Sequence, residues 1–490
     1  MNRSPLEGLD GDIHDVVVIG AGAVGCAAVR QLSARGFKTL LVDRGDVGAG
    51  TSSRSSRMLY SGLGYLATRY PIYQMIFRPF DMWQRLTYTR HVMQCRTELV
   101  KEMPGHLTRH RFHYPFRKGD RYPPWLVDMG FRLVEALGSW KVPLAYQRLT
   151  PAEAARSSPL AADVGGRLQG VGVFEEYMYA WPERICIDTA LDAVARGARL
   201  RTYTEVKNVK RENDFWTITL GKTAPECQGV AKVKARMVIN AAGPWVDRVP
   251  GAGGDQASRV IGIKGVNVMV RLPENYRGHG LEAFSRKGEP YYVFPWRDYH
   301  FIGPTESVFT DNPDKVQVED AEIDYILDEA DHLFPTVNLT RADILHCWCG
   351  VRPTSTQGGE STYLPVRLSE MPDKPDLLTL TGSTIMLHRH AARLIAKRVE
   401  SRLGKRGAPP RGVIMRQPPD LERILTHEHV VRLSDLIRRR LPDGLDPDLG
   451  CTRAEKLSRI AAAHLGWSET RRQEELRHFN EDTEKVYRKP

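Results

Sequence analysis

The sequence predicts an α/β protein with a parallel-sheet domain, an inserted antiparallel sheet and a small all-α C-terminal domain. A buried strand, a glycine-rich turn, a helix and a second strand follow one another in residues 15–43, as in a parallel α/β unit. Two stretches between residues 260 and 301 alternate, which favours antiparallel strands. Beyond residue 420, apolar residues recur at helical spacing. At 490 residues the chain is long enough for two or three domains.

The N-terminal unit has the spacing of a Rossmann-like dinucleotide site. Gly-x-Gly-x-x-Gly occupies residues 20–25, directly after a β-branched run, and the second apolar run ends on Asp43. The glycines allow a tight turn, a close pyrophosphate and close helix packing, while the helix start offers N–H groups and the acid binds ribose hydroxyls. A merely connecting loop would leave Asp43 unexplained. The predicted residues are Gly20, Ala21, Gly22, Ala23, Val24, Gly25, Asp43 and Arg44.

Residues 51–66 indicate which dinucleotide is bound. They read Thr-Ser-Ser-Arg-Ser-Ser and then Arg-Met-Leu-Tyr-Ser-Gly-Leu-Gly-Tyr-Leu. This stretch resembles the FAD-dependent glycerol-3-phosphate dehydrogenases, in which T-S-S-x-S-S-K-L-x-H-G-G-L-R-Y-L follows the first βαβ unit. The resemblance implies FAD, with the hydroxyls at a second phosphate and the flavin edge; the alternative is a solvated serine-rich turn. The residues concerned are Thr51, Ser52, Ser53, Ser55 and Ser56.

Three later segments complete the site that the resemblance implies. Residues 240–245 read Asn-Ala-Ala-Gly-Pro-Trp at a strand end, where small residues pass close to FAD, and the strand around Val206 contacts the adenine. Residues 350–353, Gly-Val-Arg-Pro, match a family segment whose arginine lies near flavin and substrate. A helix expected over 383–398 directs its N-terminal N–H groups at the flavin pyrimidine. The residues implied are Ala242, Gly243, Gly350, Arg352, Gly382, Ser383, Thr384 and Ile385.

The resemblance spans nearly the whole chain and implies its division into domains. Residues 1–406 form an FAD-dependent oxidoreductase region, 407–419 a Gly/Pro-rich linker and 420–490 a helical C-terminal domain. Within the first region, FAD-binding parts cover about 12–66, 183–250 and 343–406, and substrate-domain parts cover about 67–182 and 251–342. Periodicity predicts helices over 79–100, 183–198 and 318–333, and strands over 200–209, 215–220, 230–239, 261–270, 291–301 and 378–382.

Composition limits the partners and the location. The net charge of +11 is not accompanied by a basic stripe interleaved with aromatic residues, so we expect no nucleic-acid partner. The chain has no uncharged apolar run long enough to span a bilayer, no signal-peptide pattern and an odd number of cysteines, 7, which predicts a cytoplasmic protein with reduced thiols. Residues 79–100 mix arginine with large apolar residues, so peripheral contact with the inner face of a membrane is one expectation. Packing on the flavin domain is the other, and a homodimer is also left open.

The chain departs from the family at the substrate site. Tyr60 stands where the family has a histidine, Gly64 where it has an arginine, Asn267 where the sheet carries a second histidine, and Thr384 where it has a lysine. Each lost charge-assisted hydrogen bond removes about 1.5–3 kcal/mol, which disfavours glycerol 3-phosphate as substrate. Cations placed elsewhere could compensate; the candidates are Arg57, Lys264, Arg286, Arg297 and His388.

These residues predict an oxidoreductase that acts on a CH–OH group of a small polyol-like substrate. The candidate catalytic residues are Arg352, which stabilises developing negative charge, His388 and Tyr60 as possible bases, and Asn267 as an orienting group. An amine or amino-acid oxidase and a catalytically impaired flavin-binding protein are the alternatives. The electron acceptor is a quinone, oxygen or another protein. Cys347 and Cys349 alternate on a strand without a second ligand pair, so we predict no metal site.

Overall fold

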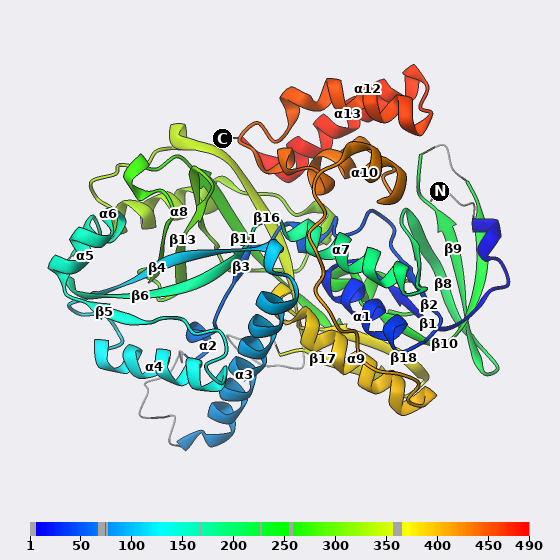
Figure 1. Cartoon of the computed structure of the whole chain (residues 1–490), viewed down its shortest axis with the longest axis horizontal. Coiled ribbons are helices and arrows are strands. Elements are labelled where there is room, and N and C mark those ends of the chain that lie inside the picture. The colour runs from blue at the N-terminus through cyan, green and yellow to red at the C-terminus, as the bar shows by residue number, and fades with distance from the viewer. Residues whose placement is uncertain are drawn as a thin grey trace.

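The computed structural model describes residues 6–66, 74, 77–166, 168–225, 228–253, 258–355 and 365–489. Two sheets lie side by side, and a helical segment crosses one end of both (Figure 1). The first sheet has the order β17-β18-β10-β1-β2-β7, with β9 pairing β10 and β8 pairing β9. Its strands are β1 (Ile13–Ile19), β2 (Thr39–Val42), β7 (Arg199–Arg201), β8 (Thr204–Glu212), β9 (Phe215–Lys222), β10 (Val230–Asn240), β17 (Arg367–Met371) and β18 (Lys374–Thr381).

The centre of the first sheet is parallel, as the N-terminal unit predicts. β18, β10, β1, β2 and β7 all run in one direction. α1 (Ala23–Ala34) packs between α7 (Pro182–Ala195) and α9 (His388–Leu403). Small buried residues, Cys26, Ala27 and Ala28, let α1 approach the sheet closely. A Cβ at Gly25 would lie 1.8 Å from the Gly20 carbonyl oxygen, so this glycine is required by packing.

The second sheet has the order β19-β16-β11-β14-β13-β12-β4-β6-β3, with β15 beside β11 and β5 beside β6. Within the described part of the chain, neighbouring strands of this sheet run antiparallel, except for the parallel pair β4 and β12. One face packs on α8 (Asp320–Leu333) and α6 (Pro159–Ala162), and the other carries an aromatic core. Its strands are β3 (Met58–Leu59), β4 (Leu107–Arg117), β5 (Gln147–Leu149), β6 (Leu168–Tyr179), β11 (Val260–Val270), β12 (His279–Phe284), β13 (Pro290–Trp296), β14 (Tyr299–Gly303), β15 (Ser307–Phe309), β16 (Ile344–Ser355) and β19 (Tyr487–Arg488).

Helices complete this half of the molecule. α3 is long and begins with proline at its first position, where the missing N–H costs nothing. Thr150 caps the helix that follows it, through a capping box with Glu153. The helices are α2 (Leu63–Leu66), α3 (Pro79–Glu102), α4 (Pro124–Leu137), α5 (Pro151–Ser157), α6 (Pro159–Ala162) and α8 (Asp320–Leu333).

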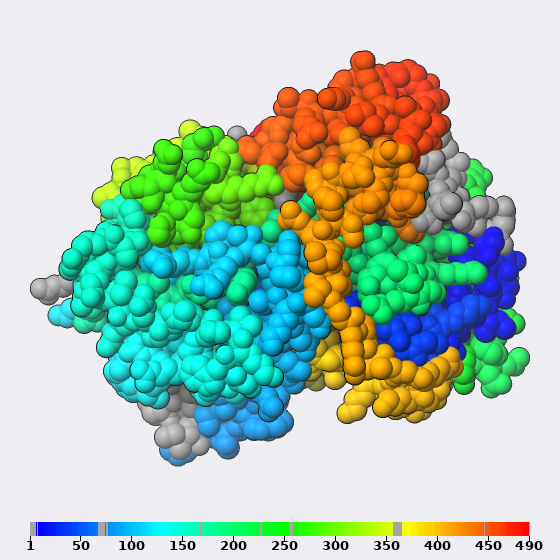
Figure 2. Space-filling view, in the orientation of Figure 1, coloured from blue at the N-terminus to red at the C-terminus, as the bar shows by residue number. Residues whose placement is uncertain are grey.

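The C-terminal region reaches its position through an extended segment. Residues 404–420 form a narrow band over the surface between the two halves (Figure 2). Beyond them lie α10 (Leu421–His427), α11 (Leu433–Asp435), a π-helical turn (Leu436–Arg440), α12 (Cys451–Leu465) and α13 (Glu469–Val486). Arg439 Nε and Arg440 Nη2 bind the buried Asp46 carboxylate at 2.6 and 2.7 Å. Burial opposes ionisation of Asp46, but these two arginines hold its pKa below the usual value.

Several sequence-based boundaries are wrong. Residues 200–209 contain two strands, because the chain turns at Tyr203, whose φ is +49°. Residues 291–301 form the hairpin β13–β14, with Arg297 at φ +52° in the turn. The helix expected from Ser383 begins at His388, after a 3-10 turn at Ile385–Leu387. The C-terminal region is not purely helical, because β19 pairs with β16.

Candidate active site

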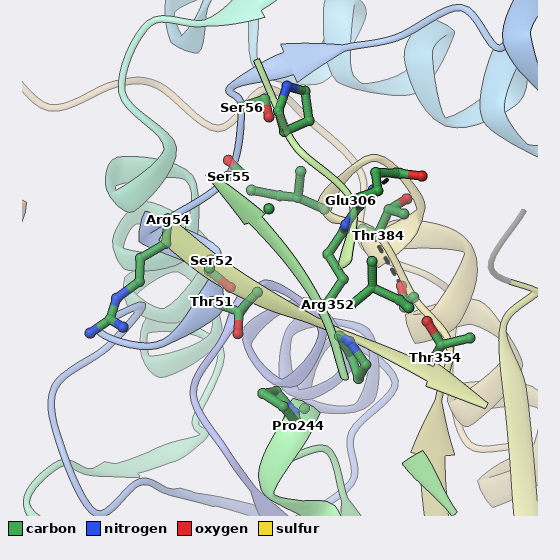
Figure 3. A pocket seen from close by; sticks show the side chains of 18 of the residues that line it. Thr51, Ser52, Arg54, Ser55, Ser56, Pro244, Glu306, Arg352, Thr354 and Thr384 are labelled. Carbon is green, nitrogen blue, oxygen red and sulfur yellow. Dashed lines mark hydrogen bonds and ion pairs between the residues drawn. The ribbon is translucent and has the colours of Figure 1, made fainter. Parts of the chain in front are cut away.

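A cavity of about 1350 Å³ lies between the two sheets. One wall comes from the carboxyl ends of β1, β2 and β10, where an open parallel α/β sheet binds its ligands. The other wall comes from β11, β13 and β16 of the second sheet. Figure 3 shows the hydroxyl side chains of Thr51, Ser52, Ser55 and Ser56 and the pair Arg352–Glu306 around this space. The cavity is large enough for a dinucleotide and a small substrate together.

The glycine-rich turn forms the end of the cavity nearest α1. Gly20 has φ +103°, and a Cβ there would lie 2.7 Å from the Ala241 carbonyl oxygen. Gly22 lines the cavity, and its added Cβ would lie 3.2 Å from Ser52 Oγ. Ser52 Oγ accepts a hydrogen bond from the Ala23 N–H at 3.0 Å and so fixes the serine-rich segment against the helix start. This end presents helix N–H groups and hydroxyls, which suits a pyrophosphate.

Asp43 lies where the spacing of the motif predicts it, at the end of β2. Its Oδ2 accepts from the Ala21 N–H at 2.7 Å and its Oδ1 from the Gly45 N–H at 2.8 Å. Burial raises the pKa of Asp43, although both N–H bonds oppose that shift. Asp43, Arg44 and Val206 all line the cavity, and the Arg44 guanidinium is paired with Asp314 at 2.5 Å rather than with Asp43. The carboxylate is therefore available to ribose hydroxyls at this end.

The opposite end of the cavity carries polar atoms without partners among the described residues. Asn267 Oδ1, Thr354 Oγ1 and Thr384 Oγ1 are buried, make no hydrogen bond there, and belong to residues that line the cavity. A Cβ at Gly350 would lie 2.9 Å from the Arg54 carbonyl oxygen, so the two segments approach as closely as backbone allows. A Cβ at Gly243 would enter open space in the cavity. Buried polar atoms call for a hydrogen-bonding ligand, and FAD fits this donor and acceptor set.

The structure brings most of the predicted residues to one cavity. Four lie outside its lining: Ala21, Gly25, Ser53 and His388. Ala21 and Gly25 act through the backbone of the turn, and Ser53 Oγ donates to the Gly50 carbonyl at 2.9 Å. The others line it, namely Gly20, Gly22, Ala23, Val24, Asp43, Arg44, Thr51, Ser52, Ser55, Ser56, Tyr60, Val206, Ala242, Gly243, Asn267, Gly350, Arg352, Gly382, Ser383, Thr384 and Ile385.

His388 is poorly placed to act as a base. It is 1% exposed, and its Nδ1 lies 2.5 Å from the Ile385 carbonyl oxygen. Burial, with the charge of Arg389, lowers its pKa to about 3. The imidazole therefore stays neutral within the start of α9, because the turn at 385–387 directs it into the core.

Arg352 lines the cavity but is not a free cation. Its Nη2 lies 2.6 Å from Glu306 Oε1, a partner that sequence reasoning missed (Figure 3). Glu306 comes directly before β15, which pairs with β11, as does β16, the strand that carries Arg352. No local pattern connects two residues 46 positions apart. The pair brings a near-neutral, hydrogen-bonding unit to the cavity wall.

Tyr60 contacts a buried acid that the sequence analysis also missed. Its hydroxyl donates to Glu282 Oε1 at 2.8 Å and accepts from the Gly64 N–H. Burial and the nearby Glu282 raise the pKa of Tyr60 far above its usual value, so the phenol keeps its proton near neutrality. Burial raises the pKa of Glu282 to about 8. The sequence feature that could have indicated this buried acid is the single glutamate in the otherwise mostly apolar segment 279–284.

Three of the candidate compensating cations are paired with acids, and Arg57 contacts aromatic rings instead. The Arg57 guanidinium lies over the Trp296 ring at 4.6 Å. Lys264 pairs with Glu319 and Glu322, Arg286 with Glu329, and Arg297 with Asp446. Arg57 and Arg286 are part of the cavity lining, whereas Lys264 and Arg297 are not. Within the described residues, Arg57 Nε and Nη1 are buried and make no hydrogen bond, so Arg57 remains a candidate to replace one of the cations lost from the family pattern, whereas the other three are not.

No group of three or more His, Cys, Asp or Glu in the described ranges is arranged to hold a metal ion. Cys347 and Cys349 are buried thiols on β16, and burial raises their pKa values to about 12 and about 11. Among the same residues, no helix combines the length and the apolar character needed to cross a bilayer.

Comparisons with known proteins agree with this geometry. Residues 15–398 match the family described as "FAD dependent oxidoreductase". The glycerol-3-phosphate dehydrogenase of Synechocystis sp. is 27% identical over 432 residues, which cover 84% of this chain and 74% of that protein. The aerobic glycerol-3-phosphate dehydrogenase of Staphylococcus aureus is 27% identical over 402 residues, covering 81% and 69%.

Solved structures extend the likeness of fold. The glycerol-3-phosphate dehydrogenase from Bacillus halodurans, complexed with FAD, superposes with a TM-score of 0.76 at 18% identity, covering 98% of this chain and 96% of that one. Glycine oxidase from Geobacillus kaustophilus gives a TM-score of 0.56 at 22% identity, covering 80% and 95%. The family match spans most of the chain and its cofactor fits the cavity, so the protein belongs to the FAD dependent oxidoreductase family.

Proposed function

We propose that the protein oxidises a CH–OH group of a small, polar, polyol-like substrate by hydride transfer to flavin N5. The observation that carries this proposal is the cavity end lined by Tyr60, Asn267 and Arg352, beside the segments expected at the flavin. Bound FAD supplies the two-electron acceptor. The protein must then bind the hydroxyl, orient its C–H bond and take up one proton.

The side chains at this end suit those tasks. The unpartnered Asn267 Oδ1 is an acceptor for a substrate hydroxyl. Arg352 stabilises negative charge that develops on the substrate oxygen. Tyr65, Tyr292 and Phe294 add aromatic surface that excludes water from the reacting bond.

The charge balance supports a substrate other than glycerol 3-phosphate. A phosphate dianion needs several cations, but Arg352 already pairs with Glu306 at 2.6 Å. Gly64 and Thr384, which line the cavity, replace cations of the resembling family. An uncharged polyol needs hydroxyl partners rather than cations, and this wall provides them.

An amine or amino-acid oxidase is the second candidate, and the shared fold with glycine oxidase favours it. For that function, Arg352 would bind a substrate carboxylate and would give up its hydrogen bond to Glu306. A flavin-binding protein with impaired catalysis is the third.

Anaerobic mixing of the holoenzyme with polyols, their phosphates, hydroxy acids and amines separates these functions. We expect loss of the oxidised-flavin absorption with uncharged polyols and not with amines. Bleaching by amines alone would replace the first candidate by the second, and no bleaching by any compound would leave the third. The rate of reoxidation by a quinone, by oxygen or by an added protein then identifies the acceptor.

We also propose that the surface of α3 and α4 contacts a bilayer. Helices α3 and α4 lie next to each other at one edge of the molecule (Figure 1). Seven exposed apolar side chains lie just before α3, on its first turns, and on or next to α4. They are Phe77, Phe80, Trp83, Trp125, Met129, Leu133 and Trp140. On α4 three of them recur every fourth residue and so form one face. Trp and Phe beside exposed Arg78, Arg132 and Lys141 suit an anionic lipid interface.

Sedimentation with phosphatidylglycerol vesicles tests this contact. Trp125→Ser combined with Met129→Ser should abolish co-sedimentation, because it removes apolar area from that face of α4. Val230→Ser is the matched control, since Val230 is 64% exposed but lies on β10. Equal binding of both variants would contradict the assignment.

We retain the proposed division into FAD-binding parts 12–66, 183–250 and 343–406, substrate-domain parts 67–182 and 251–342, linker 407–419 and helical domain 420–490. The pairing of β16 with β11 connects a proposed FAD-binding part to the substrate-domain sheet. Residues 344–355 lie in the sheet of the substrate domain while lining the cofactor end of the cavity.

A further inference from the structure

A buried carboxyl group lies directly behind the cavity wall. Glu282 is 3% exposed and belongs to β12. Its Oε1 accepts from the Tyr60 hydroxyl at 2.8 Å and from the Tyr292 hydroxyl at 3.5 Å. Tyr292 lies opposite Glu282 in the β12–β13 register, so the sheet itself fixes this contact. Both tyrosines line the cavity and Glu282 does not.

The hydrogen bonds of Tyr60 leave one position for a ligand. A phenol has one O–H and two lone pairs on its oxygen. The O–H is directed at Glu282, and one lone pair accepts from the Gly64 N–H. The Tyr292 hydroxyl also lies within hydrogen-bonding range of Tyr60, but its own proton is directed at Glu282. The second lone pair of Tyr60 can therefore accept a hydroxyl proton from a molecule in the cavity. Tyr60 thus connects the cavity to the buried acid through a single oxygen.

Glu282 is the member of this cluster suited to hold the proton. Tyr60 and Tyr292 donate to it, Tyr114 packs nearby, and Glu176 is the charged neighbour. Glu176 has its own partners, the Ser61 N–H at 2.7 Å and Arg96 at 3.4 Å. Glu282 Oε2 has no hydrogen-bond partner among the described residues, and no cation pairs with this carboxyl group there. Burial, reinforced by Glu176, brings the pKa of Glu282 to about 8, so it exchanges protons near neutrality.

We propose that Glu282 receives the substrate's hydroxyl proton through Tyr60. This inference rests on the proposed alcohol oxidation and deepens it. The substrate O–H bond breaks and its proton passes to Tyr60 Oη, while the Tyr60 O–H proton passes to Glu282 Oε1. The adjacent C–H bond breaks with both electrons leaving as hydride to the flavin, so the alcohol becomes a carbonyl. Glu282 ends neutral and later releases one proton to solvent.

In this arrangement Glu282 is a positioning and proton-storing residue, and Tyr60 is the catalytic one. The pairing also explains how a phenol that keeps its proton can still accept one. A tyrosine that donates to a carboxylate becomes a base as soon as its own proton moves on. It makes Tyr60 a functional replacement for the histidine that the resembling family has at this position.

The first test is the pH dependence of flavin reduction by the best substrate of the panel, measured anaerobically. The rate should rise with pH through a midpoint near 8, because only ionised Glu282 accepts the proton. Glu282→Gln should lose this step and slow the reduction about 100-fold or more. Tyr60→Phe should do the same, and the double variant should be no slower than either single one. A Glu282→Gln enzyme with the wild-type rate and pH profile would overturn the proposal.

A second test needs no substrate. Infrared difference spectra of the FAD-loaded protein should show a protonated carboxyl band that disappears with a midpoint near pH 8 and is absent in Glu282→Gln. If Glu282 is already ionised at pH 6, the proposal fails even if alcohols are oxidised. If the band titrates but no alcohol bleaches the flavin, the proposed function fails and with it the proton transfer. Flavin content and circular dichroism establish that each variant is folded.

Discussion

At the scale of single residues, two acids outside the sequence motifs pair with the predicted residues Arg352 and Tyr60. Glu306 binds Arg352, and Glu282 binds Tyr60, at 2.6 and 2.8 Å. Neither acid belongs to a motif, and each meets its partner only after the second sheet forms. The sequence therefore predicts which residues line the cavity better than it predicts their protonation or charge.

Replacing Arg352 by alanine should slow flavin reduction and leave FAD bound. In the proposed reaction, the substitution removes the guanidinium that would donate to the developing oxyanion, and loss of one such donor costs about 100- to 1000-fold in rate. Arg352→Lys is the matched control and should recover part of the rate. Rapid-reaction absorbance measures both variants, and unchanged reduction in Arg352→Ala would remove this residue from the site.

Gly22→Val should prevent FAD retention, because its side chain would contact Ser52 in the turn where we propose that the pyrophosphate binds. Gly8→Val is the control, since a Cβ at Gly8 meets nothing within 4 Å. The ratio of flavin to protein absorbance after gel filtration gives the result. A fully loaded Gly22→Val protein would contradict the assigned turn.

Glu282 also makes stability depend on pH. Burial raises its pKa in the folded state to about 8, above that of the unfolded chain. As pH rises, Glu282 therefore loses its proton first in the unfolded state, which lowers the free energy of unfolding. The stabilising contribution of the protonated carboxyl group is fully present in acid and has disappeared above about pH 8. Urea titrations of Glu282→Gln should show a weaker fall in stability over that range than wild type; equal slopes would argue against the raised pKa.

At the scale of elements, the sequence pattern predicts those helices and strands whose contacts lie close together in the chain. The unit β1–α1–β2 is predicted by the periodicity of its apolar residues, the spacing of its glycines and the acid at the end of β2, and the structure confirms it. The pairing of β19 with β16 joins residues 347–348 to 487–488, and no periodicity encodes such a contact. The break between β13 and β14 depends on one positive φ, at Arg297, which a continuous alternating pattern conceals.

The contact between the π-helical turn and the loop after β2 should dominate the stability of the C-terminal region. Asp46→Ala leaves Arg440 buried without its carboxylate, and breaking such a pair costs about 3–5 kcal/mol. Glu481→Ala is the control, because its pair with Arg477 is exposed and contributes about 1 kcal/mol or less. Chemical denaturation compares the two, and equal losses would contradict the buried network.

At the scale of the whole molecule, the cavity joins the two sheets, since each provides one of its walls. A ligand that binds only the folded state stabilises it by about 2.7 kcal/mol at one hundred times its dissociation constant. Removal of FAD should therefore loosen β1 and β11 together. Hydrogen exchange of apo and holo protein tests this, and loosening confined to β1 would mean that the second sheet does not touch the cofactor.

The loop that carries Asp43 also contains Asp46, which binds Arg440. Arg440 is synthesised 394 residues after Asp46. On the ribosome, the loop that we propose binds the adenosine ribose therefore lacks this ion pair until almost the entire polypeptide has emerged. Newly made chains would acquire their yellow colour late, and a translation arrest ahead of the π-helical turn would yield a pale product.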